Sequence, residues 1–153
     1  MRRPAPGTIV RVSVSEHGFV YAVLLRTPFV RFFEQQHVGA SPNVAELQNA
    51  KILFEVAMGD SAIRDGRWPV VGVMPVDESY RPAEFVQDEK RCEIVDAAGR
   101  RAATVEECMG LERASIWQPE HIESRLADHF AGRPNVHVQE GRLRMPGERP
   151  WPW

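Results

Sequence analysis

The sequence predicts an α+β domain: a curved, mainly antiparallel β-sheet or partial barrel of about six to eight strands, with a C-terminal helix packed on it. Three observations lead to this prediction. Short alternating apolar and polar runs fill the first third, turn residues separate them closely, and one amphipathic segment follows late, at 119–131. With 153 residues and no linker, the chain is expected to be one domain, with its core at about 7–132 and an extension at 133–153 whose last eight residues are irregular.

The first third predicts a β-meander. The strands are expected at 8–14, 19–26 and 29–34. Valines at every second position of the first strand share one face, and residues 16–18 form a hairpin loop in which Gly18 suits a positive φ. The following polar residues predict a loop with a short helical turn at 44–49.

The segment Ile-Leu-Phe-Glu-Val-Ala-Met at 52–58 is apolar on both faces, which predicts a central strand. Asp60 can cap one helical turn, and Gly66 can end it in the left-handed conformation. Because only eight residues separate the two apolar runs, the next strand is expected to be the antiparallel neighbour of the first. Pro69 cannot donate a ladder hydrogen bond, so this next strand is expected at a sheet edge.

The second half predicts shorter elements. Further strands are expected at 84–87, 93–97, 100–103, 136–139 and 142–145, the last four as two hairpins. Thr104 and Glu107 have the spacing of a capping box, which starts a short helix. The helix at 119–131 begins with Pro119, ends before Gly132 and places a buried apolar stripe at every fourth position. The polar side of this helix carries His121, Arg125, Asp128 and His129, and it is expected to be solvated.

Composition excludes several classes of protein. A net charge of -2 gives no basic excess to attract nucleic acid or an anionic membrane. Neither a signal peptide nor a transmembrane run is recognisable, so a cytoplasmic protein with Cys92 and Cys108 as reduced thiols is expected. The five histidines show no metal-binding spacing, and no nucleophile elbow or phosphate-binding loop occurs. No catalytic residue, metal or cofactor is therefore predicted, although a site assembled from distant residues stays open.

Charge and tryptophans supply the remaining candidates. Acids outnumber basic residues between 77 and 96, which is interpreted either as a solvated loop or as an acidic face for a basic partner. The acids of this face are Asp77, Glu78, Glu84, Asp88 and Glu89. Trp68 and Trp117 are expected to anchor the core, each with its indole N–H bonded to backbone. Trp151 and Trp153, in the proline-rich tail, either fold over an apolar groove or are available to a partner.

Several blocks in order resemble a known family. They are Gly-Thr-Ile-Val-Arg-Val at 7–12, Tyr-Ala-Val-Leu at 21–24, the strand at 52–58, Gly-Arg-Trp at 66–68 with Val-Gly at 71–72, Phe-Val-Gln-Asp at 85–88, and the segments at 104–108, 111–117 and 119–126. This order is similar to that of the immunity protein 26 family of bacterial toxin systems, over about 7–132. Thr8 stands where the family usually has an acid, and nothing at 36–50 matches.

The resemblance implies a small α+β protein, encoded beside a toxin, that binds and neutralises this cognate toxin. The acidic face found from the charge pattern is then the expected toxin-binding surface. The family blocks give Gly66, Arg67, Trp68 and Trp117 a structural role. The alternative is a metal-assisted, phosphotriesterase-like hydrolase, which the histidine spacing does not support. A small-barrel nucleic-acid-binding module is the third reading, disfavoured by the charge. The oligomeric state stays open.

Overall fold

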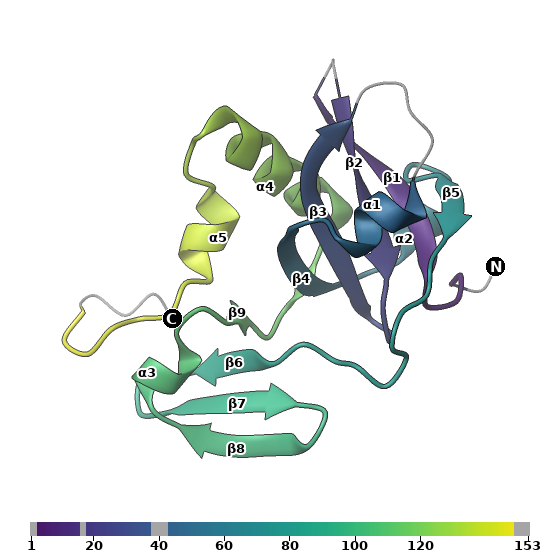
Figure 1. The fold of residues 1–153 in the computed structure, drawn as a ribbon. Coiled ribbons are helices and arrows are strands. Elements are labelled where there is room, and N and C mark those ends of the chain that lie inside the picture. Colours follow the sequence, from purple (N-terminus) through teal and green to yellow (C-terminus); the bar gives the residue numbers. More distant parts are fainter. Residues whose placement is uncertain (1–2, 16–17, 38–42, 149–153) are drawn as a thin grey trace.

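The computed structural model describes residues 3–15, 18–37 and 43–148, which form an α+β fold with ten strands in two mixed sheets (Figure 1). The larger sheet has the order β10-β4-β3-β2-β1-β5 and the smaller one the order β8-β7-β6-β9. Neither closes into a barrel. The α+β class and the C-terminal helix are confirmed, whereas the second sheet was not predicted.

The elements have the following bounds. The larger sheet contains β1 (Thr8–Ser15), β2 (Gly18–Leu24), β3 (Phe29–His37), β4 (Ile52–Met58), β5 (Val70–Val73) and β10 (Ile116–Trp117). The smaller sheet contains β6 (Glu84–Gln87), β7 (Cys92–Asp96), β8 (Gly99–Ala103) and β9 (Glu112–Arg113). The helices are α1 (Val44–Gln48), α2 (Ser61–Arg64), α3 (Val105–Cys108), α4 (Pro119–Ala131) and α5 (Val136–Glu140). Among the described residues no helix is long and apolar enough to cross a membrane.

The predicted meander is confirmed: β1, β2 and β3 pair in order as antiparallel neighbours. Both faces of the larger sheet are buried. On one face Val10, Val12 and Phe32 pack against Ile122 and Leu126 of α4. The other face packs against α1. Two buried faces explain why the central strand β2 is apolar at nearly every position. The expected hairpin residues Glu16 and His17 lie outside the described residues.

The predicted pairing of β4 with β5 is wrong. β4 pairs with β3 and, in parallel, with β10, whereas β5 pairs with β1 at the opposite edge of the sheet. Residues 59–69 cross one face of the sheet and carry α2 and Trp68. Trp68 is fully buried there, edge-on to Phe32 with ring centroids 5.9 Å apart. A large aromatic core residue thus displaces the local hairpin. The edge position expected after Pro69 is confirmed.

Of the elements predicted after residue 84, some are confirmed and one is wrong. The β7–β8 hairpin, the capping box of Thr104 and Glu107, and the helix α4 are confirmed. The predicted hairpin at 136–145 is wrong, because residues 136–140 form α5. Asn135 caps this helix: its side-chain oxygen accepts hydrogen bonds from the N–H groups of His137 and Val138, at 3.1 and 3.2 Å.

Candidate functional site

A cleft of about 540 Å³ lies where the two sheets meet α4 and α5. Its lining includes Ile116, Trp117, His121, His137, Val138 and Leu143. β10 supplies the first two of these residues, α4 the third and α5 the next two. Ile116 is 59% exposed, although it is a large apolar residue. The cleft can therefore hold an apolar or aromatic group.

The two histidines of the cleft stack on each other. The rings of His121 and His137 have centroids 3.8 Å apart and are inclined by 22°. Trp117 stands nearly perpendicular to His137, with the centroids 6.4 Å apart. Within the described ranges, no three His, Cys, Asp or Glu side chains are grouped so that they could hold a metal ion. The stack provides an aromatic wall.

An ion pair beside the cleft joins α4 to β9. Arg125 of α4 binds Glu112 of β9 through two hydrogen bonds of 2.8 Å. Its guanidinium lies 3.7 Å from the centre of the Phe54 ring and 5.1 Å from that of Trp117. The Arg125 side chain is 13% exposed, so the prediction of a solvated polar side for α4 is wrong at this residue. The pair joins the smaller sheet to the helix that covers the larger one.

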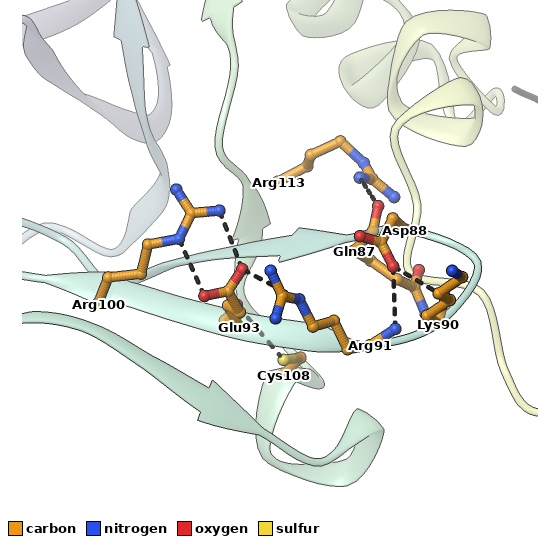
Figure 2. A network of polar contacts seen from close by, with 8 residues as sticks. All are labelled: Gln87, Asp88, Lys90, Arg91, Glu93, Arg100, Cys108 and Arg113. Atoms are coloured by element: carbon orange, nitrogen blue, oxygen red, sulfur yellow. Dashed lines mark hydrogen bonds and ion pairs between the residues drawn. The ribbon is translucent and has the colours of Figure 1, made fainter.

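Arg113 fixes the C-terminal extension to the smaller sheet. It donates hydrogen bonds to the carbonyl oxygens of Gly141, at 2.9 Å, and of Gln87, at 3.3 Å (Figure 2 shows the second). Burial lowers the pKa of Arg113, and the nearby charge of Arg144 lowers it further. The Gln87 side chain exchanges two hydrogen bonds with the backbone of Arg144, at 2.7 and 2.8 Å. These contacts place Leu143 against the cleft. Trp151 and Trp153 lie outside the described residues.

One of the five predicted acids is not exposed. Asp77 and Glu78 are in the connection before β6, and Asp88 and Glu89 are exposed in the turn after it. Glu84, between the two pairs, is 4% exposed and forms an ion pair of 2.9 Å with Arg81. Burial raises the pKa of the Glu84 carboxyl group. Glu84 is thus a correction to the predicted surface, because its carboxylate is turned inward to a guanidinium.

The Gly-Arg-Trp segment holds α4 against the larger sheet. The indole N–H of Trp68 donates to Glu123 Oε2 at 2.9 Å, so its partner is a carboxylate and not the predicted backbone group. Arg67 binds the same carboxylate and also Glu120 Oε1, at 3.1 Å. Gly66 has a φ of 83°, the left-handed conformation expected after the helical turn. One glutamate of α4 thereby connects both side chains of the segment.

Comparison with known families identifies the chain. The sequence profile described as immunity protein 26 matches residues 5–93, more than half of the chain. The chain belongs to the immunity protein 26 family. The family name indicates an immunity protein, in agreement with the resemblance seen in the sequence. No curated protein and no solved structure matches.

The immunity protein 26 match covers the N-terminal part of the fold and leaves out the C-terminal part. It covers the larger sheet up to β5, then β6, and it ends within β7. The resembling segments at 104–108, 111–117 and 119–126 lie beyond its end. Apart from Phe85, all the residues that line the cleft also lie beyond it. The exposed acids of the predicted surface thus lie inside the match, whereas the cleft and most of the β7–β8 hairpin are outside it.

Sequence reasoning missed the cleft because α5 was assigned to a hairpin. Pro134 and Asn135 before an alternating segment are a helix-start signal that could have found it. The stack of His121 on His137 has no such signal, since 16 positions separate the two residues and only the packing of α5 on α4 brings them together.

Proposed function

We propose that this protein neutralises a cognate bacterial toxin, encoded nearby, by direct protein–protein binding in the cytoplasm and without chemistry of its own. The observation that carries the proposal is the immunity protein 26 match over residues 5–93. The fold suits a binding role, because two buried faces make the larger sheet a rigid support while the connections and edges around it stay accessible. A pre-organised surface loses little conformational entropy on binding.

Without the buried Glu84, the proposed contact surface consists of four exposed acids: Asp77, Glu78, Asp88 and Glu89. Hydrogen bonds from Ser79 lower the pKa of Asp77, and the backbone N–H groups of Lys90 and Arg91 lower the pKa of Asp88. Both carboxylates are therefore ionised at neutral pH and fixed in direction. Glu78 and Glu89 stand beside them and are exposed. Such a surface attracts a basic region of a partner and raises the rate of association.

The test is a binding measurement with the purified product of the adjacent gene, by calorimetry and by surface plasmon resonance. Reversing the charges, as D77K/E78K and as D88K/E89K, should lower the association rate constant about tenfold or more at low salt. The matched control is E46K/E140K, which reverses two exposed acids outside this surface. Equal association rates for all three variants would remove the acidic residues from the interface. Absence of binding by the unaltered protein would refute the proposed function itself.

The hydrolase reading has its own readout in the same preparation. It predicts a bound transition metal in elemental analysis and turnover of a phosphotriester that a chelator abolishes. Phosphotriester turnover that requires the metal, together with no effect of this protein on the toxicity of the neighbouring gene product, would favour the hydrolase over the toxin-neutralising function.

A further inference from the structure

Strand β8 is the open edge of the smaller sheet. It pairs only with β7 among the described strands, and no described helix or loop lies beyond it in the ribbon (Figure 1). Gly99, Arg100, Arg101 and Ala102 are all exposed. The strand contains neither a proline nor a bulge against β7. About half of its residues therefore direct a free backbone N–H and C=O outward, where a further strand can pair.

The side chains on this edge present arginine outward and carboxylates beneath. Arg100 binds Glu93 through two hydrogen bonds of 3.1 and 3.0 Å, and Arg101 binds Asp96 at 2.7 Å (Figure 2 shows the first pair). Both arginine side chains are 55% exposed, whereas Glu93 is 18% and Asp96 23% exposed. Arg91 also faces Glu93 and is 71% exposed. What a partner meets first at this edge is guanidinium.

The two arginines lie on opposite faces of the smaller sheet. Cross-strand pairing sets Arg100 opposite Val95 and Arg101 opposite Ile94, and neighbouring residues in a strand alternate between faces. A strand added beside β8 would therefore meet one arginine on each face. Each guanidinium has five N–H donors, and the contacts to Glu93 and Asp96 use only part of them. Donors remain on both faces for further acceptors.

We propose that β8 receives an extended, acidic segment of the neutralised toxin as a fifth strand of the smaller sheet. This inference rests on the proposed function and adds to it the place and the chemistry of one contact. Backbone pairing supplies affinity in such strand addition, and side chains supply selectivity. Acidic residues in the incoming strand would accept hydrogen bonds from Arg100 and Arg101, which are charge-assisted and so stronger than neutral ones.

The same charges argue against a second copy of this chain as the occupant. Two β8 strands side by side would bring Arg100 and Arg101 of one copy next to those of the other, and like charges in neighbouring strands destabilise pairing. The edge is thus protected against self-association and open to an oppositely charged strand. The turn with Asp88 and Glu89 leads into Cys92, which pairs with Ala103 at the end of β8. The proposed edge and this acidic turn therefore belong to the same end of the sheet.

Two measurements on the complex with the purified product of the adjacent gene test the proposal. R100E/R101E should weaken binding about tenfold or more, and R100Q/R101Q should weaken it less. The control R64E/R133E reverses two exposed arginines, each of which also has one carboxylate partner. Thermal melts of all variants show that the fold is kept. Amide hydrogen exchange over residues 99–103 should slow in the complex, while the edge strand β5 stays unchanged.

The outcomes separate the two proposals. Suppose that the unaltered protein binds, that amide exchange at 99–103 does not change in the complex, and that R100E/R101E binds as tightly as R64E/R133E. This result would overturn strand addition and leave neutralisation intact. Exchange that slows with the concentration of this chain alone, together with a dimer in light scattering, would make a second copy the occupant and overturn the acidic partner. Absence of any binding by the unaltered protein would end both proposals.

Discussion

Replacing Arg125 with methionine should lower the free energy of unfolding by about 3 kcal/mol. The reason is the ion pair between α4 and β9, where Arg125 binds Glu112 through two hydrogen bonds of 2.8 Å. Methionine keeps most of the apolar stem but leaves the carboxylate without its partner. The prediction of a solvated helix face would instead give a change within about 0.5 kcal/mol, as for ordinary surface substitutions.

The magnitude follows from burial and geometry. Breaking a buried ion pair by removing one partner costs about 3–5 kcal/mol. Glu112 is 30% exposed, so solvent screening favours the lower end of that range. The contact of the guanidinium with the Phe54 ring, at 3.7 Å, supplies about 1 kcal/mol of this total. For a chain of this size, a loss of about 3 kcal/mol lowers the melting temperature by about 6–12 °C.

The assay is a double-mutant cycle in urea, followed by tryptophan fluorescence. R125M, E112Q and the double variant should give a coupling energy of about 2 kcal/mol between the two side chains. R133M is the matched control, because Arg133 is 65% exposed and should change stability by less than about 0.5 kcal/mol. A coupling energy near zero, with R125M equal to R133M, would refute the reasoning from this contact.

Two further predictions concern helix ends. Asn135→Ala should destabilise the protein by about 1–2 kcal/mol, since Asn135 both caps α5 and binds Ser124 and Asp128 of α4; chemical denaturation measures this, and a loss below about 0.3 kcal/mol would contradict it. Hydrogen bonds from Thr104 lower the pKa of Glu107 below its ordinary 4.5. Its stabilising contribution is therefore present above about pH 4.5 and is lost as the pH falls through the lowered folded-state pKa. Glu107→Gln should consequently melt below the unaltered protein at pH 7, and this difference should shrink as the pH is lowered below about 4.5. A difference that does not change with pH would count against the capping box as its source.

Local signals determined many of the elements. The alternating valines of β1, the capping box at Thr104 and the Pro119–Gly132 limits of α4 act over a few residues, and each appears in the structure as predicted. Local sequence decides these features because their hydrogen bonds close within one turn or between adjacent strands. The resemblance to the immunity protein 26 family was likewise readable from the sequence and is shown by the profile match.

The predictions that failed concern contacts between distant segments. The acidic run looks continuous in the sequence, yet Glu84 is buried in an ion pair with Arg81. The solvated side assigned to α4 failed at Arg125 because Glu112 and Phe54 reach it from other strands. Both errors come from judging a charged residue by its neighbours in sequence, whereas its burial depends on what packs against it.

The sequence by itself determined the α+β class, the meander, the main helix and the family. Only the tertiary structure decided that β5 joins the far edge of the larger sheet, that a second sheet exists, and that β8 is left as its open edge. The physical reason is the same in each case. Burial of Trp68 and of the apolar faces depends on the sum of long-range contacts, and this sum outweighs the local preference for pairing successive strands.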